Sequence, residues 1–407
     1  MRRLQFLLLF VSFLFLGLIL NRGASLREIY KSVCDLTNEH FYRVDRPVQD
    51  WVAQCYERAN RTSGWQSTEH LLSTIQEQMN EMGVSHFAIY NPEEDRRMWK
   101  GESIDTGIRS RFIEDHLVVY RVFPGSAAAQ AQVMPGDDIL TIEGAEQLTP
   151  WGAQHRSGKF TLRRQGVEKV AYLKTKSLVV ESAPQLTLLN SSTGLLVIPS
   201  FRSEFFARAK WHAMVSRIKP LQHMIVDIRE NPGGNFVAML RALSPFLCSG
   251  VELGQLLQLR KKSKPKTRIQ DNTEDEYQIQ ALNRYRSISL STFKDYGCYS
   301  GAVTVLIGSE TASVSEIFAE SMKRRARTRV WGQPTAGDVV VAVWYDLPYL
   351  GPGFSVSIPE AVYVTPDQRT LEGHGVVPQR ELFYELTPGL RGEDNWLTRA
   401  VHEPFSN

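Results

Sequence analysis

The chain has few cysteines and no excess of charge of either sign. Its 407 residues include four cysteines, and none of them stands in a CxxC pair or a Cys/His cluster with zinc-ligand spacing. The sequence therefore gives no support to a metal site. Its 47 basic and 44 acidic residues leave a net charge of +3, which gives no electrostatic reason to expect a nucleic-acid partner. A hydrophobic content of 43% allows a substantial core, and the length favours two or three domains.

The N-terminus has the pattern of a targeting segment. Two arginines precede an uncharged run from Phe6 to Leu20. Its 15 residues are few for a membrane-spanning helix and typical of the apolar part of a signal sequence. Residues 22–25 form a poor cleavage site, because Arg22 interrupts the small residues. We expect residues 1–25 to be a signal anchor or signal peptide. The rest would be exported, either anchored in the inner membrane and facing the periplasm or released beyond the cytoplasm.

Export would permit disulfides. The positions of the four cysteines suggest the pairs Cys34–Cys55 and Cys248–Cys298, and buried free thiols fit the sequence equally well.

Apolar periodicity divides the remaining chain into three segments. Residues 26–82 have apolar residues at helical spacing, which predicts a helical N-terminal domain over residues 26–95. Residues 96–180 contain short β-like runs separated by Gly/Pro turns, which predicts a β-rich domain. Residues 181–407 alternate strands and helices, which predicts an α/β core. Within that core, the charged stretch 251–298 is most simply a solvated excursion.

Ser313 lies where a predicted buried strand meets a predicted helix. The β-branched run Val303–Gly308 ends just before it, and an amphipathic segment begins just after it. Such a turn puts a hydroxyl at a helix N-terminus, where free amides and the helix dipole can stabilise an oxyanion. On its own, the string Thr311–Ala319 fits a helix-capping serine equally well.

The string Thr311–Ala319 strongly resembles the nucleophile segment of the C-terminal processing peptidases, also called tail-specific proteases. The resemblance implies that Ser313 is the nucleophile and that the α/β core is of the ClpP/crotonase-like type. A second match is the DxRxNxGG string from Asp227 to Gly234, whose glycines let the backbone approach a substrate closely. It implies an oxyanion hole formed by the amides of Gly234, or less favourably Gly233, and Val314.

The string Val122–Gly144 resembles the PDZ domain that is inserted in these peptidases. It contains a strand, a GSxA helix start, a PGDxI turn and a strand that ends in Glu-Gly. The resemblance makes Thr106-Gly107-Ile108 the carboxylate-binding loop, whose amides would capture a peptide C-terminus while the peptide adds to the sheet edge. A PDZ fold kept only as a spacer or lid is the alternative.

The lysine that serves most of this family as base is missing. The frame Gly332–Gly337 matches, but Asp338 follows it, and Lys323 is expected at the surface. No Ser–Lys dyad can form in the usual way. Asp338 is either a turn residue or a group that orients a histidine.

The pair Ser85-His86 resembles the tricorn-type branch of the superfamily, which uses Ser–His–Ser–Glu instead. Glu372, in the string 371–378, lies where that branch has its glutamate. The resemblance implies that Ser313 attacks, that His86 takes and returns the proton, and that Glu372 holds the imidazole, directly or through Ser85. Activity should then follow a group that titrates near pH ~6.5. His374 is the rival base, because it neighbours Glu372.

Together these features predict an exported serine endopeptidase that works through an acyl-enzyme, without metal or cofactor. Its partners would be protein or peptide substrates, an adaptor protein and, through the N-terminal anchor, a membrane. The main alternative is a catalytically inactive PDZ-type binding or scaffold protein, which the missing lysine motivates. A binder of apolar small ligands on the same core, as in retinoid-binding relatives, is a second alternative.

Overall fold

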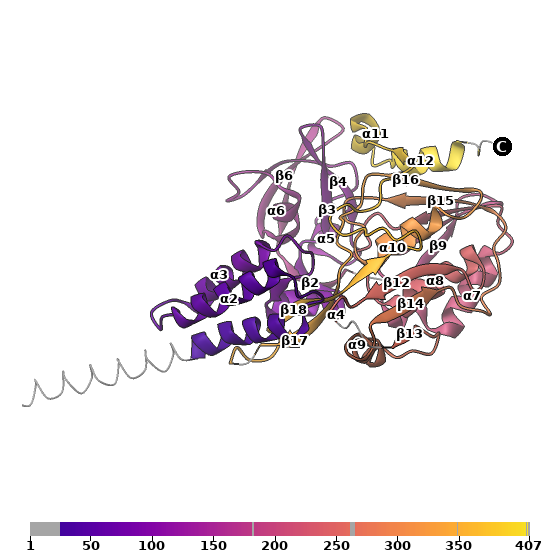
Figure 1. Ribbon diagram of the computed structural model, residues 1–407. Helices are drawn as coiled ribbons and strands as arrows, with labels where there is room; N and C mark the ends of the chain where they lie inside the picture. The colour runs from indigo at the N-terminus through magenta and orange to yellow at the C-terminus, as the bar shows by residue number, and fades with distance from the viewer. Residues whose placement is uncertain (1–24, 181–182, 261–264, 348, 404, 406–407) are drawn as a thin grey trace, which may run out of the picture. The chain divides into compact units, whose positions relative to one another are not determined.

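The computed structural model describes residues 25–180, 183–260, 265–347, 349–403 and 405 (Figure 1). The predicted signal segment therefore lies, apart from its last residue, outside the described part of the chain. Within that part, no helix has the length and apolar character needed to span a membrane. The fold is a mixed α/β arrangement in two compact units. The first unit comprises Met1–Asp95, Gly250–Phe293 and Gly337–Gly375, and the second comprises Arg96–Ser249, Lys294–Ala336 and Val376–Asn407.

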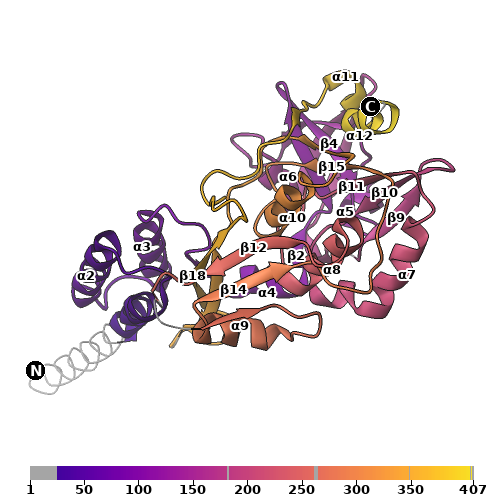
Figure 2. The ribbon, with the colours of Figure 1, turned by 45° about the vertical axis from the view of Figure 1, so that its right-hand side comes forward.

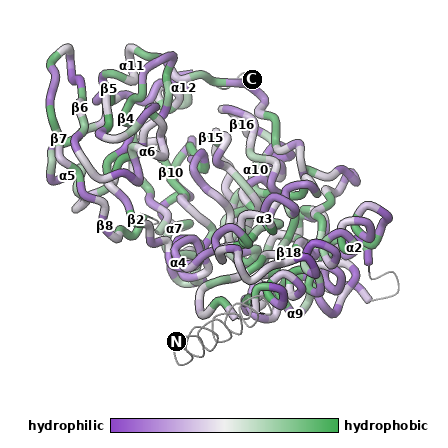
Figure 3. Tube along the Cα trace, turned by 90° about the vertical axis from the view of Figure 1, so that its left-hand side faces the viewer, coloured by the Kyte–Doolittle hydropathy of each residue, from purple (hydrophilic) through white to green (hydrophobic). Residues whose placement is uncertain are grey.

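The helical part of the first unit begins with a helix over residues 25–40, followed by α2 (Arg46–Asn60) and α3 (Thr68–Asn80). The predicted helical character of this segment is confirmed. Hydrophobic and hydrophilic residues alternate along these helices (Figure 3). The apolar side chains pack into one buried cluster. The disulfide Cys34–Cys55 joins the first of the helices to α2.

The sheet of the first unit combines three stretches of chain that are distant in sequence. Its strands follow the order β1 (Ala88–Tyr90), β18 (Ser355–Val364), β12 (Glu252–Leu257), β14 (Ser287–Ser291) and β13 (Lys266–Arg268), with β17 (Val341–Asp346) paired to β18 and α9 (Asp275–Arg284) between β13 and β14. The prediction that 251–298 is a solvated excursion is wrong. Its strands bury Leu253, Leu256 and Leu290, because apolar residues recur within the charged sequence.

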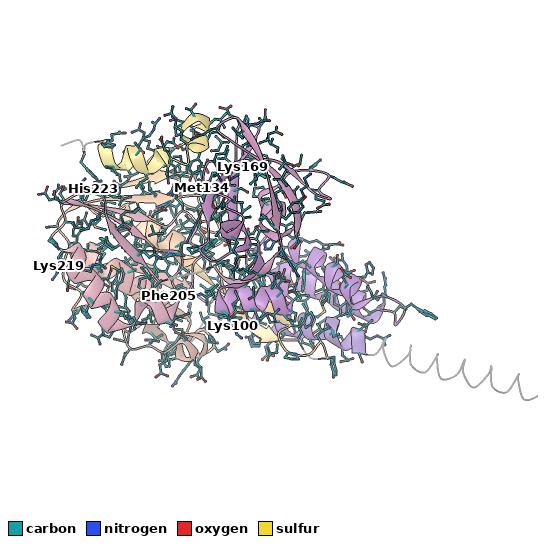
Figure 4. All side chains as sticks on the ribbon, turned by 180° about the vertical axis from the view of Figure 1, so that it is seen from behind. Lys100, Met134, Lys169, Phe205, Lys219 and His223 are labelled. Carbon is teal, nitrogen blue, oxygen red and sulfur yellow. A yellow bond between two sulfur atoms is a disulfide. The ribbon has the colours of Figure 1, made fainter. Side chains whose placement is uncertain are left out.

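The second unit contains a five-stranded antiparallel sheet within residues 96–180. Its strands run in chain order: β3 (Ile108–Ile113), β4 (His116–Val122), β5 (Asp138–Ile142), β6 (Gly158–Arg164) and β7 (Val167–Leu173). The short helices α5 (Ala127–Gln130) and α6 (Pro150–His155) help to enclose its core, and β2 (Glu102–Asp105) pairs with β8 (Lys176–Val179) beside it. The labelled residues Met134 and Lys169 locate this part of the chain in Figure 4.

A largely parallel sheet forms the centre of the second unit. Its order is β19 (Arg380–Glu381), β16 (Thr328–Gly332), β15 (Ala302–Ile307), β11 (His223–Asp227), β10 (Thr193–Val197) and β9 (Gln185–Leu188), of which only β9 is antiparallel to its neighbour. The helical elements of this part are η1 (Ser203–Phe206), α7 (Arg208–Ile218), α8 (Phe236–Leu247), α10 (Val314–Met322), α11 (Leu386–Leu390) and α12 (Asn395–His402), while α4 (Pro92–Lys100) precedes them (Figure 2).

This topology brings two loops together. The neighbouring strands β11 and β15 are parallel and in register, with Asp227 opposite Leu306. Loops that follow adjacent parallel strands emerge at the same edge of the sheet, where α/β proteins place their sites. The DxRxNxGG loop and the Ser313 turn therefore meet in the second unit.

Candidate active site

Ser313 occupies a strained turn at the start of α10. Its φ of 59° and ψ of −130° fall in a region that a side chain disfavours. Such a conformation costs about 1–3 kcal/mol and persists only where the surroundings hold it. The Ser313 amide donates to Glu316 Oε1 at 3.2 Å, and the Glu316 amide donates to the Ser313 carbonyl at 2.9 Å. The turn is thus fixed with the serine at the helix N-terminus.

Glu316 is a site residue that the sequence analysis did not single out. Its side chain is buried, and its second oxygen accepts a hydrogen bond from Thr335 Oγ1 at 2.5 Å. The spacing Ser313-x-x-Glu316 is that of a capping box, which is the signal that could have identified it.

The glycines of the DxRxNxGG loop allow the loop to approach the serine closely. A Cβ on Gly233 would lie 2.6 Å from Ser313 Cβ, and one on Gly234 would lie 2.5 Å from the carbonyl oxygen of Phe201. Both glycines have positive φ, of 107° and 137°. No other residue fits either position without displacing its neighbour.

Some main-chain amides of the glycine loop and the Ser313 turn donate hydrogen bonds within the protein, and others do not. The Gly233 amide donates to Asn231 Oδ1 at 2.9 Å, so it is engaged. Over the described residues, no hydrogen bond is found for the amides of Gly234 and Val314. This supports the preference for Gly234 over Gly233 as the oxyanion donor beside Val314.

Asn231 joins the glycine loop to the serine turn, and sequence reasoning gave it no role. Its Oδ1 also accepts from Ser315 Oγ at 2.7 Å, and its carbonyl accepts from the Ala312 amide at 3.1 Å. The side chain is fully buried and its Nδ2 donates to the Ile198 carbonyl at 3.0 Å. The two loops therefore form one rigid structure.

Arg229 supports this structure from the side of the C-terminal helix. Its guanidinium lies 2.6 Å from Asp227 Oδ2 and 2.6 Å from Asp394 Oδ2, and it donates to Tyr384 Oη at 3.2 Å. Burial of Asp394 opposes its ionisation, but the Arg229 charge and hydrogen bond hold the pKa of this carboxyl below its usual value.

The first unit contains the other predicted catalytic residues. Ser85 donates twice to Glu372, from its amide to Oε1 at 2.7 Å and from its hydroxyl to Oε2 at 2.9 Å. The amides of Val339 and Val340 also donate to Glu372 Oε2, at 2.8 and 2.9 Å. The predicted Ser85–Glu372 pairing therefore exists, and the carboxylate is held by four donors.

His86 follows Ser85 in the chain, and its backbone has a φ of 54°, in the left-handed region. It forms a hydrogen bond with the main chain of Asp338, whereas its buried Nε2 has no partner among the described residues. Nδ1 must then carry the proton, which leaves the Nε2 lone pair available as a base. Burial lowers the pKa of His86, and the charges of Asp338 and Glu372 oppose that change.

The remaining candidates for the base are less suitable. His374 is exposed, and its Nδ1 lies 2.9 Å from the Glu372 carbonyl. Lys323 pairs with Glu320 at 3.3 Å at the far end of α10 from Ser313. Asp338 contributes its main chain to His86, which is an orienting role of the kind the sequence left open.

The loop Thr106-Gly107-Ile108 is buried, and its amides are all engaged. They donate to the Gln154 carbonyl at 2.8 Å, to Asp105 Oδ1 at 2.6 Å and to Thr106 Oγ1 at 3.2 Å, respectively. The PDZ resemblance predicts that these amides face a ligand. Capture of a peptide C-terminus by this loop stays a prediction, and it would require these bonds to open.

A family model matches the part of the chain that contains Ser313. The model of peptidase family S41 matches residues 192–382, which include both loops of the second unit and Glu372. The chain is also 22% identical over 287 residues to a protein of Staphylococcus aureus (strain N315) described as a probable CtpA-like serine protease, a match that covers 68% of this chain and 52% of the relative. A relative in Staphylococcus epidermidis (strain ATCC 12228 / FDA PCI 1200) has the same identity. The chain thus spans about half the length of the curated relatives it matches.

Solved structures share the fold of this chain over most of its length. The photosystem II D1 C-terminal processing protease has a TM-score of 0.52 at 17% identity, covering 91% of this chain and 98% of its own. Mature CPAF complexed with lactacystin has a TM-score of 0.59 at 11% identity, covering 94% and 100%. The tricorn protease has a TM-score of 0.52 at 17% identity, covering 93% of this chain and 36% of its own. The matched segment, residues 192–382, is thus similar to serine-type peptidases, in agreement with the family resemblance seen in the sequence.

Proposed function

We propose that this protein is a serine endopeptidase that cleaves protein or peptide substrates through an acyl-enzyme at Ser313. The observation that carries the proposal is the Ser313 turn, where a strained serine begins α10 next to two unengaged amides, those of Gly234 and Val314. A serine that merely capped a helix would need neither the strain nor the glycine loop held against it. An inactive scaffold is not favoured by the relatives, which are described as serine proteases.

His86 is the proposed base, because its free Nε2 and the Asp338 hydrogen bond define a neutral imidazole with an available lone pair. Glu372 accepts two hydrogen bonds from Ser85 and so fixes the residue that precedes His86. Its negative charge stabilises the imidazolium that forms in the reaction. The tricorn-type resemblance implies that Glu372 holds the imidazole directly or through Ser85; in this proposal the hydrogen bond to His86 comes from the main chain of Asp338 instead, and Glu372 acts through its charge.

The proposed reaction proceeds in two steps. Ser313 Oγ attacks the scissile carbonyl carbon while His86 Nε2 takes the hydroxyl proton, and the Gly234 and Val314 amides stabilise the resulting oxyanion. His86 then returns the proton to the leaving amine, which departs as the acyl-enzyme forms. A water molecule, deprotonated by His86, attacks the ester, and collapse of the second tetrahedral intermediate returns the proton to Ser313.

Residues 96–180 would act as a PDZ-like domain that binds substrate polypeptide or gates its access. Its five-stranded sheet and the strings of the PDZ resemblance support this role. The disulfides Cys34–Cys55 and Cys248–Cys298 favour an oxidising compartment, in keeping with export and an N-terminal membrane anchor that faces the periplasm. An adaptor protein that delivers substrates remains part of the proposal.

A fluorophosphonate probe tests the proposed activity directly, because it reacts with activated serines. The wild-type protein should be labelled on the peptide that contains Ser313, and the Ser313→Ala variant should not be labelled. Ser309→Ala, at an exposed serine of the same loop, is the matched control for a neighbouring hydroxyl. Absence of labelling in folded wild-type protein would support the scaffold alternative instead.

A further inference from the structure

The loop that leads into β3 is unused by the proposed chemistry, and it holds an unusual arrangement. Residues 105–108 are all buried. In a PDZ-like domain, the amides of such a loop bind the carboxylate at the end of a peptide. Here a carboxylate already lies at this position, and it belongs to Asp105.

The Asp105 side chain receives the donors that a peptide terminus would need. Its Oδ1 accepts from the Gly107 amide at 2.6 Å, and its Oδ2 accepts from Gln154 Nε2 at 2.9 Å and from Arg109 Nη1 at 3.0 Å. The side chain is 0% exposed, whereas that of Arg109 is 15% exposed. A main-chain amide, a side-chain amide and a guanidinium together satisfy one buried carboxylate.

The rest of the loop is closed by α6. The carbonyl of Gln154 accepts from the Thr106 amide at 2.8 Å, and the carbonyl of Ala153 accepts from Thr106 Oγ1 at 2.8 Å. On the opposite side, a Cβ on Gly107 would lie 2.0 Å from Ser126 Cβ, so there is no free space there either. The amides of residues 106–108 and the Thr106 hydroxyl are therefore all engaged, so an incoming carboxylate would have to compete for them.

We propose that Asp105 is a specificity-determining residue whose carboxylate takes the place of a substrate C-terminus. The domain then selects polypeptide segments without reading a free α-carboxylate. A terminal carboxylate that displaced Asp105 would leave that buried charge unpaired and would gain no hydrogen bond that Asp105 does not already make. The inference rests on the proposed function only in naming these polypeptides as substrates, since binding at this loop requires no catalysis.

The test compares peptides that differ only at their C-terminus. The full-length Ser313→Ala protein is titrated by fluorescence anisotropy with labelled peptides of one sequence, as free acid and as amide. The two forms should bind within about twofold of each other. Adding Asp105→Ala frees the Gly107 amide and leaves Arg109 without its carboxylate partner, so the free acid should then bind at least about tenfold more tightly than the amide.

A second measurement covers peptides that bind too weakly to titrate. Sodium acetate, compared with sodium chloride at equal ionic strength, should raise the melting temperature of the Asp105→Ala protein by several degrees and leave the parent unchanged. Asp115→Ala, at an exposed aspartate of the same domain, is the control and should behave like the parent. If Asp105→Ala does not fold, the comparison of free-acid and amide peptides on the parent protein still decides, because a preference of about tenfold or more for the free acid would overturn the proposal.

Two results would overturn the proposal. One is a parent protein that already prefers the free acid about tenfold or more. The other is an Asp105 variant that gains neither a preference for the free acid nor stabilisation by acetate. Because all these proteins carry Ser313→Ala, either result leaves the proposed peptidase activity untouched, and failure of fluorophosphonate labelling leaves this proposal untouched.

Discussion

At the scale of single residues, His86 and Ser313 share a feature that sequence patterns do not carry. Both have positive φ, 54° and 59°, although neither is glycine. Strain of this kind is concentrated at functional sites, where the surrounding structure must maintain it. For Ser313 the surroundings are Glu316 and the glycine loop, and for His86 they include Ser357, whose hydroxyl donates to the His86 carbonyl at 2.5 Å.

The pKa of His86 sets the expected pH dependence. Burial lowers it from the ordinary value of 6.5, and the nearby charges of Asp338 and Glu372 only partly oppose this. A general base must be neutral, so activity is lost as the pH falls through the pKa of the imidazole. The acid limb of kcat/KM should therefore have its midpoint below pH 6.5, rather than at the value that sequence alone predicts. A midpoint above that pH would show that another group is the base.

Gly233→Ala tests whether close approach of the glycine loop matters for the serine. The added methyl would lie 2.6 Å from Ser313 Cβ and must displace it. A displacement of about 1 Å at a reacting group costs on the order of 100-fold in rate. Fluorophosphonate labelling of Ser313 should slow by about that factor.

The matched control for this substitution is Gly166→Ala. Gly166 also has positive φ, of +81°, but a Cβ added there would meet nothing within 4 Å, so this variant isolates backbone strain from displacement of the serine. It should label at the parental rate. Equal effects of the two substitutions would contradict a special role for Gly233.

At the scale of elements, the C-terminal helix α12 stabilises the loop that follows β11. Asp394, which caps α12, pairs with Arg229 at 2.6 Å. Asp394→Asn should lower the free energy of unfolding by about 1–3 kcal/mol at pH 7, the range for a hydrogen bond to a charged group. Because the pKa of Asp394 is lowered in the folded state, this contribution is present above the unfolded value of about 4 and is lost as the pH falls through the folded pKa.

Urea unfolding at several pH values measures this effect. The gap between parent and Asp394→Asn should be full at pH 7 and should close below pH ~4. Asp367→Asn removes an aspartate from an exposed ion pair with Arg369 and should change stability little at either pH. A gap that persists unchanged into acid would assign the effect to packing rather than to charge.

The sequence predicted several elements well, because their patterns are local. The apolar run before Ser313 is β15, the segment after it is α10, and the helical spacing of residues 26–82 corresponds to real helices. The charged stretch 251–298 was misjudged, because its burial comes from pairing of β12 with β14 and β18, which are distant in sequence.

Other parts of the site could not be read from the sequence. Asp338 acts on His86 through its charge and through a main-chain hydrogen bond, and the hydrogen bond leaves no signal in the sequence because any residue type would supply the same carbonyl. The role of Asp105 depends on α6, about 50 residues away, whose Gln154 binds it. Contacts of this kind follow from tertiary structure and leave no periodic pattern in the chain.

At the scale of the whole molecule, the chain passes twice from the second unit to the first and back. Each of these two segments is flanked by a pair of residues of the second unit that are bonded to each other. Cys248–Cys298 closes the segment Gly250–Phe293, and Thr335 pairs with Val376 around the segment Gly337–Gly375. The second of these segments contains Asp338 and Glu372, so the pairing of Thr335 with Val376 helps to fix the positions of two residues in the proposed site.

Removal of the Cys248–Cys298 disulfide should destabilise the first excursion. The bridge closes 50 residues, whereas Cys34–Cys55 closes 21. A double Cys→Ser variant at Cys248 and Cys298 should lose about 2–4 kcal/mol of stability, more than the double variant at Cys34 and Cys55. Limited proteolysis followed by mass spectrometry should locate new cuts within residues 250–293, and cuts confined to other segments would contradict this account.

The rate of fluorophosphonate labelling at Ser313 tests the central claim, that His86 activates Ser313, most directly. The parent, His86→Ala and His374→Ala proteins are compared at pH 7, with folding checked by circular dichroism. The account predicts that His86→Ala slows labelling by at least about 1,000-fold, as expected for a member of a catalytic triad, while His374→Ala labels at the parental rate. Near-parental labelling of His86→Ala, or loss of labelling in His374→Ala alone, would contradict it.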